Sequence, residues 1–99
     1  MAAYWFFDIL EIIDPAAMEE YRARVVATVT QSGGRYLIIG GPATVVEGDW
    51  QPVFPVLIEF PSREQAQRWY DSTEYRELKA LRQAATRGNV VFLEGTTLE

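Results

Sequence analysis

Two segments of this chain read as strands whose residues are apolar on both faces. They are residues 4–10, with the sequence YWFFDIL, and residues 53–60, with the sequence VFPVLIEF. A strand with one face in water alternates apolar and polar residues, because successive side chains point to opposite faces of the sheet. Both faces of the sheet that these strands form must therefore be covered.

The sequence supplies a first helix after the first of these strands. Asp14 followed by Pro15 is typical of a helix start, with an N-cap residue before a proline at the first helical position. An apolar stripe then follows at spacings of three and four residues, formed by Met18, Tyr21, Val25 and Val29. Gly33 and Gly34 predict a left-handed C-cap that ends the helix.

A second helical region follows the segment 53–60. Ser62 and Gln65 form a capping box, in which each side chain binds a free amide of the first turn. The helix is interrupted at residues 71–73 and continues with a second apolar stripe until Gly88 ends it. The inward residues of the two pieces are Ala66, Trp69, Tyr70, Tyr75, Leu78, Leu81 and Ala85.

The remaining segments predict the other strands. Residues 35–39 form a second strand that bends at two glycines and resumes at residues 44–46, and a hairpin turn at residues 47–49 leads to the third strand. Residues 90–94 form the last strand. The order βαββαβ favours an α+β, ferredoxin-like sandwich, which we expect to have strands one and three parallel at its centre and both helices on one face. The second face is then expected to be covered by another copy of the chain.

Composition excludes several classes of function. The chain has 99 residues, which predicts one domain spanning 1–99, and a net charge of −5, which disfavours nucleic acid as a partner. It has no histidine and no cysteine, so we expect no metal site, no haem and no other cofactor. No apolar run is long enough for a membrane span and no signal peptide is recognisable, which favours a cytoplasmic location.

Carboxylates inside apolar strands are the candidates for acid or base chemistry, since such surroundings can raise a pKa. Asp8 and Glu59 are the ionisable residues in these positions, and we predict Glu59 as the catalytic residue. If strands one and three are parallel, Glu11 lies beside Glu59 near the starts of both helices. The alternative is that these carboxylates are structural and bind helix amides or neighbouring tyrosines.

Aromatic residues on the helices are candidates for the walls of a ligand cleft. We predict Tyr21, Trp69 and Tyr70 as ligand-binding residues, because aromatic walls with polar tips suit a small organic molecule. Arg35 could bind a ligand carboxylate with its planar guanidinium group. The alternatives are core packing for the aromatic residues and a solvated or ion-paired side chain for Arg35.

Two further features of the sequence, a row of basic residues and an exposed tryptophan, are explained without a ligand site. Arg76, Lys79 and Arg82 lie at three-residue spacing, and the acidic residues between them predict a solvated helix face rather than an anion site. Trp50 follows a turn and is too exposed in this context to be ordinary core. We expect Trp50 either to insert into a partner subunit or to cap the end of the barrel that two copies would form.

The sequence also resembles a known family over nearly its whole length. The matching residues are Tyr4, Trp5, Asp14, Pro15, Tyr21, 33–37, Gly40, Gly41, Glu47, Gly48, 58–62, Trp69, Tyr70, Ser72, Glu74, Tyr75, Glu94 and Gly95. The most specific part is residues 59–62 followed by Trp69, Tyr70 and Tyr75. These residues resemble the bacterial domain-of-unknown-function family 1330, which is similar to the dimeric α+β barrel superfamily.

That resemblance implies a fold and a homodimer in which two ferredoxin-like sheets pack face to face. Relatives in the superfamily include cofactor-independent oxygenases, isomerases, dechlorinases and stress proteins, but the resemblance brings no catalytic residues to this chain. Two hypotheses remain open. The first is a cofactor-independent enzyme or binder of a small hydrophobic or carbonyl-containing metabolite, held in a cleft between sheet and helices. The second is a non-catalytic stress or regulatory dimer that binds a metabolite or a partner protein.

Overall fold

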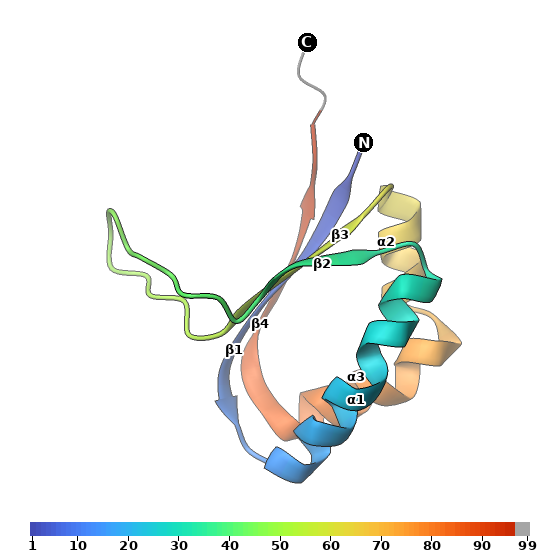
Figure 1. Cartoon of the computed structure of the whole chain (residues 1–99), viewed down its shortest axis with the longest axis horizontal. Helices are drawn as coiled ribbons and strands as arrows, with labels where there is room; N and C mark the ends of the chain where they lie inside the picture. Colours follow the sequence, from blue (N-terminus) through green and yellow to red (C-terminus); the bar gives the residue numbers. More distant parts are fainter. Residues whose placement is uncertain (97–99) are drawn as a thin grey trace.

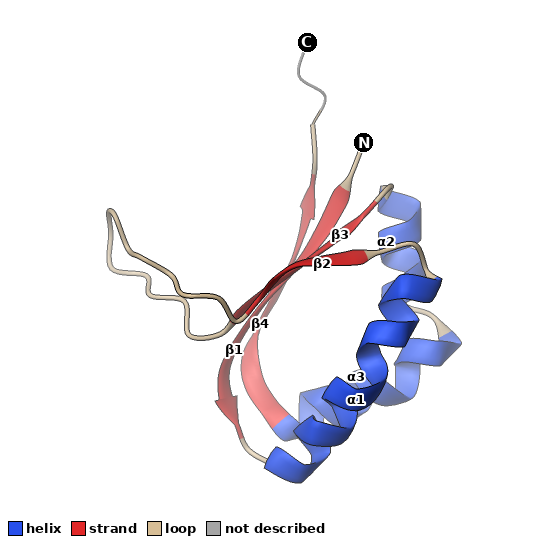
Figure 2. Ribbon diagram, viewed as in Figure 1, coloured by secondary structure: helices blue, strands red, loops and turns tan. Residues whose placement is uncertain are grey.

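The computed structural model describes residues 1–96, which form a four-stranded sheet with helices on one face (Figures 1 and 2). The strands are β1 (Ala3–Ile12), β2 (Arg35–Ile39), β3 (Pro55–Phe60) and β4 (Thr86–Glu94). The helices are α1 (Pro15–Gln31), α2 (Arg63–Tyr70) and α3 (Thr73–Ala85). This is the predicted α+β, ferredoxin-like order, with the second helical region divided into α2 and α3.

The strands follow the order β2-β3-β1-β4, and all neighbouring strands are antiparallel. The prediction that strands one and three are parallel is therefore wrong. The crossover through α1 makes β1 and β2 parallel, and β3 returns from β2 in the opposite direction to fill the place between them. As a result Glu59 lies opposite Tyr4 in the register, whereas Glu11 pairs with Arg87 at the other end of β1.

The predicted N-cap bonds of Asp14 and Ser62 are present, whereas the side chain of Gln65 accepts from the hydroxyl of Ser62 at 3.0 Å and not from its amide. The side chain of Asp14 accepts a hydrogen bond from the amide of Ala17 at 3.2 Å, and Ser62 accepts one from the amide of Gln65 at 3.2 Å. Gly33, with φ of 86°, ends α1 in the left-handed region that glycine adopts without strain. The stripe predicted for α1 is also confirmed, because Met18, Tyr21, Val25 and Val29 are its buried residues.

The segment between β2 and β3 is a long loop, residues 40–54, rather than a continued strand and hairpin. It extends away from the helices (Figure 1). Gly40 has a φ of 63°, so the chain leaves the extended conformation of β2 there, and its amide donates to the carbonyl of Pro55 at 2.6 Å. A Cβ on Gly40 would lie 2.2 Å from the ring of Phe54, so this ring occupies the space that a side chain would need.

The last strand begins at Thr86, earlier than the predicted start at residue 90. Gly88 does not end a helix but pairs with Ile9 inside the sheet. A Cβ at Gly88 would lie 2.3 Å from the backbone oxygen of Asp8. Gly88 therefore permits the close approach of β1 and β4 beside the irregularity in β1.

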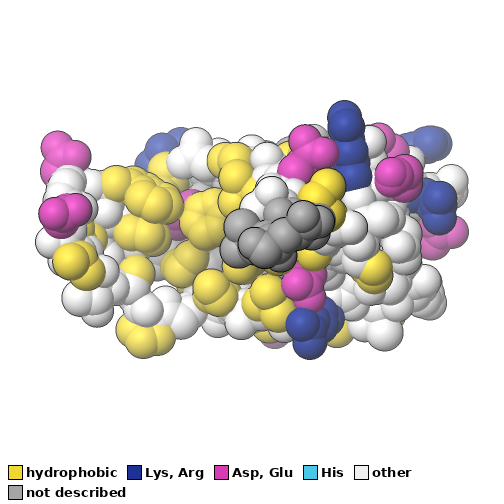
Figure 3. All heavy atoms as spheres, turned by 90° about the horizontal axis from the view of Figure 1, so that it is seen from above, with side chains coloured by type: hydrophobic (Ala, Val, Ile, Leu, Met, Phe, Trp, Pro, Cys, Tyr) yellow, Lys and Arg dark blue, Asp and Glu magenta, His cyan; other side chains and the backbone are white. Residues whose placement is uncertain are grey.

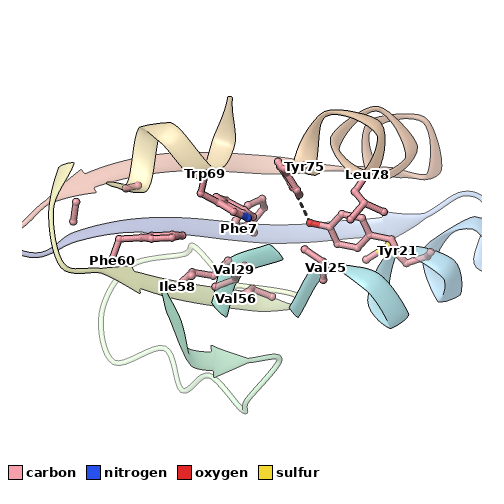
Figure 4. Packing of buried hydrophobic residues seen from close by; sticks show 13 residues of the cluster. Phe7, Tyr21, Val25, Val29, Val56, Ile58, Phe60, Trp69, Tyr75 and Leu78 are labelled. Atoms are coloured by element: carbon pink, nitrogen blue, oxygen red, sulfur yellow. Dashed lines mark hydrogen bonds between the residues drawn. The ribbon is translucent and has the colours of Figure 1, made fainter. Parts of the chain in front are cut away.

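The main core lies between the sheet and the helices (Figure 4). Trp69, Phe60 and Tyr75 are completely buried there. The indole of Trp69 stacks on Tyr75 with ring centroids 4.2 Å apart, and its Nε1 donates to Oγ1 of Thr28 at 3.0 Å. Trp69 thus joins α1, α2 and α3 to the sheet.

The other face of the sheet carries no helix, and we call it the open face. Its apolar side chains alternate with those that face the helices, and they are Tyr4, Phe6, Ile38, Leu57, Val91 and Leu93. Ile38, Val91 and Leu93 are 40% to 46% exposed. From above, hydrophobic side chains gather on the half of the molecule with the sheet and the long loop, and most charged ones on the helix half (Figure 3). The helices thus cover one sheet face only, as predicted.

Candidate functional site

A cavity of about 230 Å³ opens between the helix-covered face of the sheet and helices α1 and α3. Most of its wall is apolar, and the polar side chains that reach it are Tyr21, Tyr36, Arg22 and Arg82. The complete lining is Phe7, Ile9, Met18, Tyr21, Arg22, Val25, Val26, Tyr36, Ile39, Phe54, Val56, Ile58 and Arg82. An apolar cavity with a few polar groups is typical of a site for a small organic ligand.

Arg82 is the most unusual residue in this wall, because it is only 6% exposed. Its Nε donates to the hydroxyl oxygen of Tyr75 at 3.3 Å and its Nη2 to that of Tyr70 at 3.4 Å. Its guanidinium carbon lies 5.2 Å from the centroid of the Phe7 ring. Within residues 1–96 no carboxylate lies within 4.0 Å of Arg82, and its Nη1 makes no hydrogen bond.

The tyrosines around Arg82 do not neutralise its charge. Burial raises the pKa of Tyr21, and the neighbouring Tyr75 raises it further. Burial also raises the pKa of Tyr75, against the opposing effect of Arg82. Burial lowers the pKa of Arg82, but the oxygens of Tyr75, Tyr21 and Tyr70 outweigh it, so that the pKa is raised. Near neutral pH the site therefore contains a guanidinium cation and neutral phenols.

The hydrogen bonds among these groups leave the hydroxyl of Tyr21 as a donor, in addition to Nη1 of Arg82. The hydroxyls of Tyr21 and Tyr75 are 2.8 Å apart, as the dashed line in Figure 4 marks. Because a guanidinium can only donate, Tyr75 accepts from Arg82 and can give its own proton to Tyr21. In this arrangement Tyr21, which lines the cavity, keeps its own proton for another acceptor. The site then offers donors to an oxygen atom of a ligand.

The residues predicted for ligand binding are divided between this cavity and other places. Tyr21 lines the cavity, and Tyr70 lies one hydrogen bond away from it through Arg82. Tyr70 also stacks on Trp5, with centroids 4.3 Å apart. Trp69 belongs to the buried core and is not in the cavity wall. Arg35 lies at the edge of the sheet on the open face.

Glu59, the predicted catalytic residue, also lies on the open face. Its carboxylate pairs with Nε of Arg35 at 2.7 Å and accepts a hydrogen bond from the hydroxyl of Tyr4 at 3.3 Å. The neighbouring side chains of β3, Ile58 and Phe60, face the helices. A role for Glu59 as acid or base stays a prediction, and the sheet separates its carboxylate from the cavity.

The other candidate carboxylates have structural partners. Asp8 is 1% exposed, and its Oδ1 accepts hydrogen bonds from the amides of Val53 and Phe54, both at 2.9 Å. Asp8 thereby fixes the base of the long loop and with it the Phe54 ring that lines the cavity. Its Oδ2 has no partner in the described part of the chain. Glu11 forms an exposed pair with Arg87 at 3.3 Å, far from Glu59 in the register.

The prediction that Arg82 belongs to a solvated helix face is wrong. The buried residues of α3 are Tyr75, Leu78, Arg82 and Ala85. Their spacing of three, four and three residues is itself the signal that places Arg82 on the inward stripe. Leu81, which was predicted to lie on this inward stripe, is only half-buried.

Trp50 is 61% exposed and sits on the long loop. Its ring contacts that of Phe6 on the open face edge-on, with centroids 6.1 Å apart. Its insertion into a partner subunit stays a prediction. Among residues 1–96 no helix is long and apolar enough to cross a membrane.

These features define an α+β, ferredoxin-like domain with a ligand-sized cavity on one side of its sheet. The chain belongs to the DUF1330 family, a domain of unknown function whose family model matches residues 2–96. No curated protein matches the sequence.

Solved structures share the fold at low sequence identity. A protein of unknown function from Rhodopseudomonas palustris superposes with a TM-score of 0.73 and 17% identity, over 98% of this chain and 84% of that one. SnoaB, a cofactor-independent oxygenase from Streptomyces nogalater, superposes with a TM-score of 0.58 and 14% identity, over 98% of this chain and 93% of that one. An antibiotic biosynthesis monooxygenase superposes with a TM-score of 0.56 and 18% identity, over 98% of this chain and 100% of that one. At these identities the similarity establishes the fold alone.

Proposed function

We propose that this domain binds a small hydrophobic molecule with a carbonyl or anionic oxygen in the cavity between the sheet and helices α1 and α3. The observation that carries the proposal is the cavity itself, an apolar chamber with the donors of Tyr21 and Arg82 in one part of its wall. Such a wall holds the apolar body of a ligand by burial and fixes its orientation by hydrogen bonds.

The size of the cavity restricts the ligand. Its volume of about 230 Å³ is below the roughly 300–1,000 Å³ of sites for drug-sized molecules. A single ring with a short side chain is the kind of molecule that suits this space. The long loop contributes Phe54 to the wall, so its clamp to Asp8 also helps to set the size of the cavity.

The chemistry of the wall favours holding an oxyanion over abstracting a proton. Its polar groups are two arginine cations and two neutral phenols, and the part of the wall that the structure describes contains no Asp or Glu. Positive charge and phenol donors stabilise negative charge on a ligand oxygen. Binding of the molecule is therefore the function we propose, in preference to a proton-transfer reaction with a carboxylate base.

We also propose that the domain is a homodimer, located in the cytoplasm, in which the open faces of two copies pack together. The support is the band of apolar side chains on the open face, contributed by all four strands. Monomers rarely leave contiguous apolar patches of more than a few hundred Å² in water, so we expect this face to be covered. A stable interface of this kind buries on the order of 1,600 Å² in total. The absence of cysteine from the sequence suits a reducing compartment.

Binding to the cavity can be tested with a neutral probe molecule and with a variant in which a larger side chain blocks the cavity entrance. We expect 3-phenylpropanamide to bind with a dissociation constant in the millimolar range, on the order expected for a fragment. Val26 lines the cavity and is 49% exposed, so it stands at the opening. A Val26→Trp variant should weaken binding by at least about tenfold, because the indole fills the entrance. Titration followed by ¹⁵N chemical shifts measures the affinity.

The matched control is Ala27→Trp, which adds an indole at the next, exposed position of α1. This variant should bind the probe as the wild type does. Equal affinity in Val26→Trp and wild type, with both proteins folded, would place the binding site elsewhere.

A further inference from the structure

We infer that Arg82 is the anchor for a ligand carboxylate, and that the natural ligand is a compact, apolar monocarboxylate. This inference rests on the proposed function and adds the chemical class of the ligand. It starts from one observation, an arginine that is only 6% exposed and has no acidic partner in residues 1–96.

An isolated charge is unfavourable inside a protein, and buried arginines are nearly always paired with an acid. The groups around Arg82 compensate its buried positive charge only in part. Tyr75 and Tyr70 provide neutral oxygens, and the face of Phe7 provides a weak electrostatic attraction. A carboxylate in the cavity would supply the missing negative charge at the place where the wall already admits a ligand.

Two donors in the cavity wall are available to such a carboxylate. Nη1 of Arg82 has no partner among the described residues, and the guanidinium group reaches the cavity wall. Tyr21 also lines the cavity, and its hydroxyl is linked to Arg82 through the hydroxyl of Tyr75, which binds both. A carboxylate has two oxygens, so one can accept from Nη1 and the other from Tyr21.

The rest of the wall limits the charge of the ligand to a single negative unit. The other arginine of the wall, Arg22, pairs with Glu19 at 3.6 Å on the outside of α1. The remaining residues of the wall are apolar except for Tyr36, and burial keeps the phenol of Tyr36 neutral by raising its pKa. A second negative charge would be buried there without a partner, and the net charge of −5 adds a general repulsion.

The test compares two probes that differ in charge and hardly in shape, 3-phenylpropionate and 3-phenylpropanamide. Wild-type protein should bind the carboxylate at least about tenfold more tightly, the amount expected for a charge-assisted hydrogen bond. In Arg82→Met this preference should vanish, while affinity for the amide stays within about threefold of the wild-type value. Isothermal titration calorimetry measures the four affinities.

Arg24→Met is the matched control, since it removes an arginine of α1 that does not line the cavity and leaves Arg82 in place. It should change the preference for the carboxylate by less than about threefold. If Arg82→Met fails to fold, Arg82→Gln keeps a donor for Tyr75 without the charge, and it too must lose the preference.

Each other outcome overturns the inference. Equal binding of both probes by the wild type removes the anion from the ligand class and leaves the cavity as the binding site. A preference that survives in Arg82→Gln makes the other arginine of the wall, Arg22, the anchor. Failure of both probes to bind contradicts the proposed function together with the inference.

Discussion

A Leu57→Asp variant should be monomeric at concentrations at which the wild type is a dimer. Leu57 lies on β3 in the middle of the open face, opposite Phe6 and Ile38 in the register. An interface between two open faces would bury the new carboxylate without a partner, which costs about 3 kcal/mol or more in each subunit. Because the symmetry repeats the change, dimerisation should weaken by roughly 10⁴-fold or more. Light scattering at low micromolar concentration distinguishes the 11.3 kDa chain from twice that mass.

Ala27→Asp is the control for this experiment, because it places the same charge on the exposed face of α1. This variant should remain a dimer. A dimeric Leu57→Asp protein would show that the copies associate through another surface. A wild-type protein that stays monomeric and well folded at this concentration would refute the homodimer.

Trp69→Ala should lower the free energy of unfolding by about 3 to 5 kcal/mol, the usual cost of truncating a buried tryptophan. Trp69 is completely buried, stacks on Tyr75 and donates a hydrogen bond to Thr28 on α1. The variant leaves a large cavity where α1, α2 and the sheet meet. Urea unfolding at a fixed protein concentration measures the change, since the stability of a dimer depends on concentration.

Trp69→Phe is the matched comparison, because it keeps an aromatic ring against Tyr75 and removes the donor to Thr28. It should cost less than half as much as Trp69→Ala. If Trp69→Ala costs less than about 1 kcal/mol, Trp69 does not hold the layers together.

Local signals in the sequence predicted much of the fold. The cap at Asp14, the cap at Ser62 and the left-handed glycine at Gly33 act within a few residues, so their patterns survive in any tertiary context. The order of helices and strands predicted a sheet with helices on one face only. The structure confirms that arrangement in the open face.

Features that depend on distant contacts were predicted poorly. The direction of β3 relative to β1 follows from the crossover through α1, and no local pattern encodes it. The early start of β4 depends on Gly88, whose role is visible only beside the backbone of Asp8. Residues 44–46 read as a strand but have no neighbouring strand in the described chain to pair with.

The residues of the candidate site were also predicted in part and missed in part. Tyr21 could be predicted, because it lies on the apolar stripe of α1 and carries a polar tip. Arg82 was missed because charge pattern outweighed helical spacing, although it falls on the same stripe as Leu78. Glu59 was favoured because apolar residues surround it in the sequence. In the structure those neighbours face the helices, and Glu59 pairs with Arg35 on the other side.

The position of a bound probe tests the central claim most directly, that the ligand site is the cavity between sheet and helices. With methyl-labelled protein and 3-phenylpropionate, nuclear Overhauser effects should join the phenyl protons to the methyl groups of Val25 and Val56 in the cavity wall. None should reach Leu57 or Val91 on the open face. Contacts to Leu57 and Val91 without contacts to the cavity methyls would contradict the account.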